Sequence, residues 1–195
     1  MANSDTLRAF QARLASRLQA ARTADVSASW LAVEAGSGRY LFPLGQAGEI
    51  FPWTPPQPVP HTERWFLGVS NLRGGLFGVV HLAGFAEADG AVPAPATAPA
   101  ASPPHQAVVP AAGPDGLRTQ ARLVALNELL EVNCALLVDR LLGLRGVEAF
   151  ATSEAPGAGT APWLGRTYID ADGAQWQELD LHALSRQPRF LRIGA

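Results

Sequence analysis

The first stretch of the chain repeats its apolar residues at the spacing of an α-helix. Between residues 4 and 23, apolar side chains recur every three or four positions and therefore share one face. They are Leu7, Phe10, Leu14, Leu18 and Ala21. Ser4 and Asp5 suit the N-cap of such a helix. We predict an amphipathic helix within residues 1–28, docked on the body of the same protein; binding to a partner or to a membrane surface are the alternatives.

From Trp30 onward the pattern becomes that of short strands. Two pairs of apolar runs flank glycine-containing turns and predict β-hairpins: 30–34 with 39–44 around Gly36-Ser37-Gly38, and 66–72 with 76–82 around Gly74-Gly75. Five prolines between residues 52 and 60 exclude a helix or an inner strand there, because proline lacks the backbone N–H donor. We predict that this proline segment crosses the surface as an extended loop.

Residues 86–116 differ in composition from the rest of the chain. They contain seven prolines among many alanines, and no aromatic residue, leucine or isoleucine. Such a stretch buries too little apolar surface to offset the entropy of ordering it. We predict a disordered insertion in a loop, which a short linker could replace.

Beyond the insertion, extended runs return. They cover 119–127, 132–142, 147–151, 163–170 and 174–180, with Asp172-Gly173 as a hairpin turn between the last two. Leu181–Ser185 suits a short helix, and 186–195 is assigned to a C-terminal tail. Short strands without interleaved helices favour an all-β barrel or sandwich, with one folded domain over 29–185.

Composition and charge narrow the possible functions. The 195 residues are 48% hydrophobic with a net charge of −2, which suits one domain, or two very small ones packed together. The near-neutral balance argues against nucleic-acid binding. No apolar run approaches the roughly 20 residues of a membrane span. The start of the chain lacks the apolar segment of a secretory signal, so a cytoplasmic location is expected.

Candidate catalytic and metal-binding patterns are incomplete. Gly36-Ser37-Gly38 lacks the third glycine of a dinucleotide site, and Ser70 lacks the second glycine of a nucleophile elbow. The single cysteine, Cys134, excludes an internal disulfide and lies in an apolar alternating run typical of a buried, inert thiol. The four histidines show no ligand spacing. We therefore predict no enzyme, cofactor or metal site, with a small β-barrel enzyme or ligand-binding protein as the alternative.

The segment Gly68-Val69-Ser70-Asn71-Leu72-Arg73-Gly74 carries an arginine between two apolar strands. A guanidinium group can make two parallel bonds to a carboxylate or to backbone carbonyls. The pattern by itself fits either a structural hairpin or a recognition surface.

This segment resembles the G-x-x-N-L-R-G signature of the CheW-like family of chemotaxis coupling proteins. Other parts of the family pattern follow in register: 40–44, 48–50, Val59-Pro60, the 137–141 segment and the closing 168–181 hairpin. The resemblance covers residues 30–185 apart from the insertion. Where the family continues P-V-V-D-L, this chain has Gly78-Val79-Val80-His81-Leu82, so His81 replaces the aspartate. The insertion and the N-terminal helix make the chain more similar to the PilI-type members, which serve type IV pili and twitching motility.

The resemblance implies two small five-stranded, SH3-like β-barrels packed side by side, without catalysis. It implies two partners, the cytoplasmic tip of a methyl-accepting chemoreceptor and a CheA-type histidine kinase, and neither nucleic acid nor membrane insertion. Asn71, Arg73 and Gly74 would shape the receptor-facing surface, together with Glu49 and Ile50, and Val138 and Asp139 would lie on or near the contact surface of the second barrel. The expected partner-binding residues are therefore Glu49, Ile50, Gly68, Asn71, Leu72, Arg73, Gly74, Val138 and Asp139.

Overall fold

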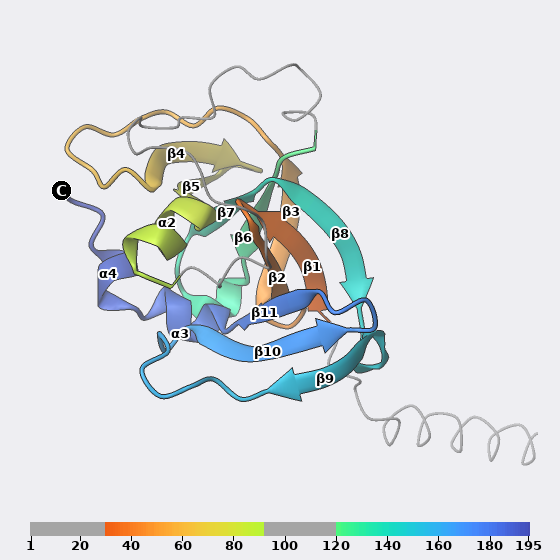
Figure 1. Cartoon of the computed structure of the whole chain (residues 1–195). Helices are drawn as coiled ribbons and strands as arrows, with labels where there is room; N and C mark the ends of the chain where they lie inside the picture. Colours follow the sequence, from red (N-terminus) through yellow and green to blue (C-terminus); the bar gives the residue numbers. More distant parts are fainter. Residues whose placement is uncertain (1–29, 92–119) are drawn as a thin grey trace, which may run out of the picture.

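The computed structural model describes residues 30–91 and 120–195, which form two β-sheets with short helices beside them (Figure 1). The strands are β1 (Trp30–Ala35), β2 (Gly38–Pro43), β3 (Ala47–Pro52), β4 (Phe66–Leu72), β5 (Gly75–His81), β6 (Arg122–Leu126), β7 (Cys134–Val138), β8 (Arg140–Arg145), β9 (Phe150–Glu154), β10 (Leu164–Asp170) and β11 (Gln175–Leu179). The helices are α2 (Leu82–Ala88), α3 (Leu181–Ser185), α4 (Pro188–Leu191) and the 3-10 turns η1 (Glu128–Leu130) and η2 (Val147–Ala149). The predicted all-β class is confirmed. The predicted N-terminal helix lies outside the described residues.

The chain crosses from one sheet to the other and back. One sheet has six strands in the order β8-β1-β2-β11-β10-β9, and the other has five in the order β3-β6-β7-β5-β4. The run 132–142, predicted as one extended segment, is two strands that separate at Asp139, because β7 pairs in the five-stranded sheet and β8 pairs with β1. This crossing gives the first sheet one strand more than the five expected.

The predicted hairpins are present, and each turn uses a left-handed backbone conformation. Gly36 (φ +59°) turns β1 into β2, and Gly173 (φ +80°) lies between β10 and β11. Between β4 and β5, Leu72 pairs with Gly75, so the turn has only two residues, Arg73 and Gly74. Tight two-residue hairpins favour positive φ because that twist matches the twist of the strands.

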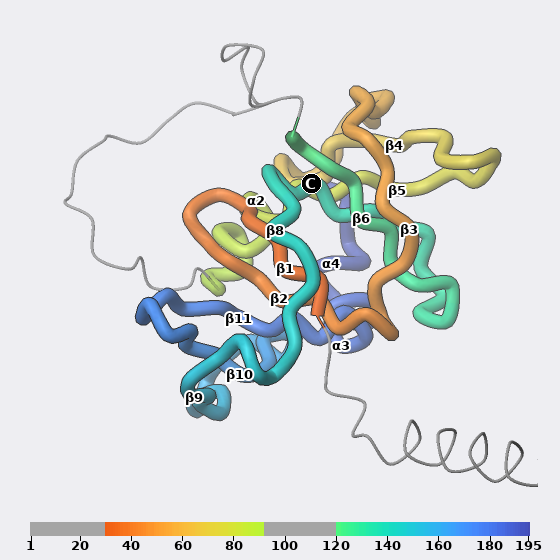
Figure 2. The backbone as a smooth tube through the Cα atoms, turned by 90° about the vertical axis from the view of Figure 1, so that its right-hand side faces the viewer, coloured from red at the N-terminus to blue at the C-terminus, as the bar shows by residue number. Residues whose placement is uncertain are grey.

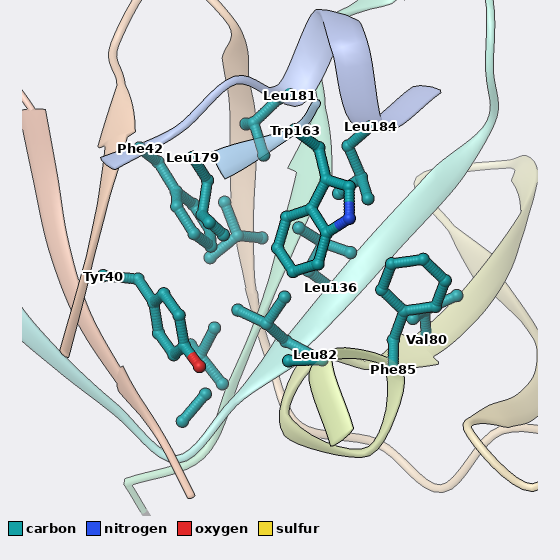
Figure 3. Packing of buried hydrophobic residues seen from close by; sticks show 14 of the residues in the cluster. Tyr40, Phe42, Val80, Leu82, Phe85, Leu136, Trp163, Leu179, Leu181 and Leu184 are labelled. Carbon is teal, nitrogen blue, oxygen red and sulfur yellow. The ribbon is translucent and has the colours of Figure 1, made fainter. Parts of the chain in front are cut away.

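The largest cluster of buried side chains lies between the two sheets, as Figure 3 shows. It joins Tyr40 and Phe42 of β2, Leu82 and Phe85 of α2, and Trp163 before β10. Two smaller clusters belong to single sheets. The one in the six-stranded sheet contains Trp30, Ala32, Leu41, Tyr168 and Trp176, and the one in the five-stranded sheet contains Leu72, Val79, Leu123, Ala135 and Leu137. Strands β1 and β7 alternate between a sheet's own cluster and the shared one, so both of their faces are buried.

Two predicted boundaries differ from the structure. The insertion was expected to begin at residue 86, yet Ala86 is a buried residue of α2 and Ala91 is also buried. Asp89, next to α2, accepts a hydrogen bond from the indole Nε1 of Trp163 at 2.7 Å. The tail assigned to 186–195 contains α4, and its Phe190 is buried in the shared core. Both segments belong to the folded domain because apolar side chains within them are buried: Ala86 and Ala91 in the first segment and Phe190 in the second.

Candidate functional site

The β4–β5 turn is built from the motif that the sequence singled out. Leu72 is buried in the five-stranded sheet, and the Oδ1 of Asn71 accepts a hydrogen bond from the backbone N–H of Gly74 at 2.9 Å. Arg73 and Gly74 have φ values of +48° and +85°. Arginine is unusual at the first of these positions, where asparagine or glycine relieves the strain. The turn therefore holds its arginine outward at a conformational cost that Asn71 and Gly74 help to offset.

Arg73 pairs with Glu49 across the five-stranded sheet. The Arg73 Nη2 lies 2.7 Å from the Glu49 Oε1, and the two side chains are 77% and 42% exposed. Glu49 is on β3 and Arg73 directly follows β4, and these strands are at opposite ends of the strand order. The contact therefore shows that the sheet curls until its edges approach each other. An ion pair this exposed contributes only about 0–1 kcal/mol to stability.

Gly68 brings the proline loop against the outer edge of β4. Backbone hydrogen bonds join Gln57 and Val69 in both directions, at 2.7 and 2.8 Å. Gly68 has a φ of +130°, and a Cβ at this position would collide with the carbonyl oxygen of Gln57. The glycine therefore allows the loop to cover the edge strand. After β3 ends at Pro52, residues 53–60 are mostly exposed and contain no helix, and Gln57 forms an isolated bridge to Val69, as expected for an extended surface segment.

Two exposed apolar residues are close in sequence to the residues of this ion pair. Ile50, adjacent to Glu49, is 39% exposed, and Leu76, just after the turn, is 63% exposed. Leu76 was not among the predicted site residues, because an apolar strand residue gives no signal of its exposure. The turn thus combines a charged pair with accessible apolar surface, which suits contact with another protein. We call Glu49, Ile50, Arg73 and Leu76 the hairpin surface.

Val138 and Asp139 lie apart from that surface, at the crossing between the sheets. Val138 is fully buried in the shared core, so its side chain contributes no contact surface. The Oδ2 of Asp139 accepts a hydrogen bond from the backbone N–H of Gly36 at 2.7 Å, and its own N–H donates to Glu34 at 2.8 Å. Asp139 therefore fastens the β1–β2 turn to the crossing.

His81, the residue in place of the family's aspartate, caps helix α2. Its Nδ1 accepts from the backbone N–H of Gly84 at 3.3 Å. Burial lowers the pKa of His81, and the nearby carboxylates of Asp139 and Glu87 oppose that shift. Neutral histidine therefore supplies the acceptor that an aspartate would supply at an N-cap.

The features that would support the alternative enzyme or ligand-binding hypothesis are few in the described part of the chain. An open cavity of about 480 Å³ lies beside α2, and its lining includes Asp89, Thr160, Gln177 and Gln187. Asp89 is already bonded to Trp163. Among residues 30–91 and 120–195, no three His, Cys, Asp or Glu side chains are placed to hold a metal ion. In the same ranges, no helix has the length and apolar character needed to cross a membrane.

The structure thus has two β-sheets, with the G-x-x-N-L-R-G turn exposed on the five-stranded one. The chain belongs to the CheW-like domain family, whose model matches residues 29–189. Over 185 residues the chain is 26% identical to Protein PilI of Pseudomonas aeruginosa, and the match covers 93% of this chain and 89% of the relative. The fold of this chain resembles that of the scaffolding protein TtCheW from Thermoanaerobacter tengcongensis, with a TM-score of 0.58 and 14% sequence identity. The match covers 82% of this chain and 88% of TtCheW. The resemblance to the CheW-like family inferred from the sequence is therefore confirmed, and so is the expected similarity to PilI.

Proposed function

We propose that this protein is a non-catalytic cytoplasmic adaptor that couples the tip of a methyl-accepting chemoreceptor to a CheA-type histidine kinase. Membership of the CheW-like domain family supports a coupling role in a chemosensory system. The similarity to Protein PilI supports assignment to the system that controls type IV pili and twitching motility.

The hairpin surface is the proposed receptor contact, and the Arg73–Glu49 pair is the observation that carries this assignment. Its two charges stay at the surface of the five-stranded sheet, although the pair adds little stability there. Asn71 and Gly74 shape the turn that carries the arginine. Gly68 lets the proline loop cover β4, and Leu72 anchors that strand in the core of its sheet. Ile50, next to Glu49 in the sequence, and Leu76, two residues after the turn, supply exposed apolar area. A partner helix with an acidic and an apolar residue on one face would satisfy both features.

Substitution of Arg73 tests the proposal. We expect Arg73→Ala to remain folded, with an unfolding free energy within about 1 kcal/mol of wild type, because the ion pair is exposed. Loss of a charged hydrogen-bonding group from an interface costs about 2–5 kcal/mol, so receptor affinity should fall more than about tenfold. Arg73→Lys should restore only part of it, since lysine cannot form a planar two-pronged contact. Affinity is measured with purified receptor signalling fragments and, separately, with the kinase.

Arg140→Ala is the matched control. Arg140 also forms a surface ion pair, with Glu34 at 3.1 Å, but on the six-stranded sheet. It should keep wild-type receptor affinity. A folded Arg73→Ala protein that binds receptor as tightly as wild type would refute the assignment of this surface. Failure of the wild-type protein to bind receptor or kinase would refute the adaptor function itself.

A further inference from the structure

The open cavity of about 480 Å³ lies between segments that are distant in the sequence. Residues 89–91 follow α2, residues 159–162 precede β10, and Gln177 belongs to β11. Figure 2 shows the end of α2 next to β11. A cavity of this volume can hold a small molecule, so the groups in its wall decide which kind it would accept.

Asp89 contributes a mostly buried carboxylate to the wall of this cavity, with its side chain only 10% exposed. One carboxylate oxygen, Oδ2, accepts the hydrogen bond from the indole of Trp163 at 2.7 Å. The other oxygen, Oδ1, lies 3.9 Å from the Nη1 of Arg189, which is too far for a hydrogen bond. Within the described residues, Oδ1 therefore has no hydrogen-bond donor, although burying an incompletely paired charge is costly.

The rest of the lining combines apolar walls with free polar groups. Ala91 is buried in the shared core, and Leu164 packs against that core from the start of β10. Thr160 and Gln187 also line the cavity, and their side chains form no hydrogen bond within the described part of the chain. The cavity thus offers an aliphatic wall beside a carboxylate, a hydroxyl and an amide.

We propose that this cavity binds a primary ammonium group on a short aliphatic chain, with the ammonium at the Oδ1 of Asp89 and the chain against Ala91 and Leu164. An ammonium group supplies both a positive charge and three hydrogen-bond donors, and a charge-assisted bond to a carboxylate is a strong one. Arg189 is about half exposed, so its guanidinium can move aside. The sequence contains no lysine, so a side-chain ammonium must come from another molecule, either a free amine or a partner's lysine. The proposal does not rest on the receptor or kinase contacts.

An NMR titration of the full chain with n-butylamine at neutral pH tests the proposal through the indole N–H signals. The signal of Trp163 reports on Asp89, and the chain holds a matched control. The indole of Trp176 donates to the Oδ2 of Asp170 at 2.9 Å, but the Oδ1 of Asp170 already accepts from two backbone N–H groups, at 3.0 and 2.8 Å. We expect n-butylamine to shift the signal of Trp163 and to leave that of Trp176 unchanged. The uncharged analogue n-butanol should shift neither.

Two variants change the affinity for n-butylamine in opposite directions. Asp89→Asn keeps an acceptor for the Trp163 indole but removes the charge, and should weaken binding at least about tenfold. Arg189→Gln removes the competing cation and should strengthen binding about two- to fivefold. The amide of Nα-acetyl-lysine is the second probe. Binding as tight as that of n-butylamine would assign the site to a partner's lysine, and binding of n-butylamine alone would assign it to a free amine.

Three results would each overturn the proposal: equal shifts of the two indole signals, an equal response to n-butanol, or unchanged affinity in Asp89→Asn. If Asp89→Asn does not fold, Arg189→Gln still decides, because weaker or unchanged binding in that variant would also overturn the proposal. None of these measurements involves the hairpin surface, so their failure would leave the adaptor function as proposed.

Discussion

Replacing Gly68 by alanine should destabilise this protein more than any other single methyl group added to the signature. A Cβ at this position would collide with the carbonyl oxygen of Gln57 and lie 2.9 Å from the Cα of Pro58. Both obstacles are backbone atoms, so no side chain can rotate away. The proline loop must therefore separate from β4, and the two Gln57–Val69 hydrogen bonds must lengthen or break.

The magnitude follows from two contributions. An alanine held at positive φ costs about 1–2 kcal/mol. Loss of two backbone hydrogen bonds adds about 1 kcal/mol each. The expected loss of unfolding free energy is therefore about 3–4 kcal/mol, a large part of the roughly 5–15 kcal/mol typical of a domain.

Urea unfolding followed by tryptophan fluorescence measures this loss, and Gly74→Ala is the matched control. Gly74 also has positive φ, +85°, but a Cβ there would meet no atom within 4 Å. It should lose only the conformational contribution of about 1–2 kcal/mol. Amide exchange at Gln57 and Val69 should accelerate in Gly68→Ala alone. Equal destabilisation of the two variants would refute the reasoning, because the collision would then contribute nothing.

Three further predictions concern the junction between the sheets. Cys134 should react with a thiol reagent at pH 8 only after denaturant is added, since burial raises its pKa to about 12; rapid labelling of native protein would contradict this. Because burial lowers the pKa of His81 in the folded state, the imidazole is protonated more readily in the unfolded state. Stability should therefore fall as the pH drops below about 6.5, and His81→Asn, which keeps an acceptor for Gly84, should remove that part of the pH dependence. Asp139→Ala should cost about 1 kcal/mol, because the exposed Gly36 N–H loses its carboxylate partner but can bond to water instead, whereas Asp139→Asn should retain most of the stability; equal loss in both would exclude the hydrogen bond as the cause.

Much of the local structure could be predicted from the sequence. Turn residues at Gly36, Gly74 and Gly173 placed three hairpins, and Leu181–Ser185 is a helix as expected. The helix α2 was missed because its start has no acidic or serine cap, and the histidine that caps it follows an apolar strand without interruption. The motifs and their order along the chain were also enough to identify the family.

The sequence by itself indicated most of the strands and the hairpin turns, because these properties depend largely on neighbours a few positions away. Only the tertiary structure decided that 132–142 divides at Asp139, that Val138 is buried while Leu76 is exposed, and that Arg73 meets Glu49 across a curled sheet. An alternating run shows that one face of a strand is apolar, but not whether another sheet covers it. Burial and pairing between distant residues depend on how the two sheets pack, and no local pattern in the chain encodes that arrangement.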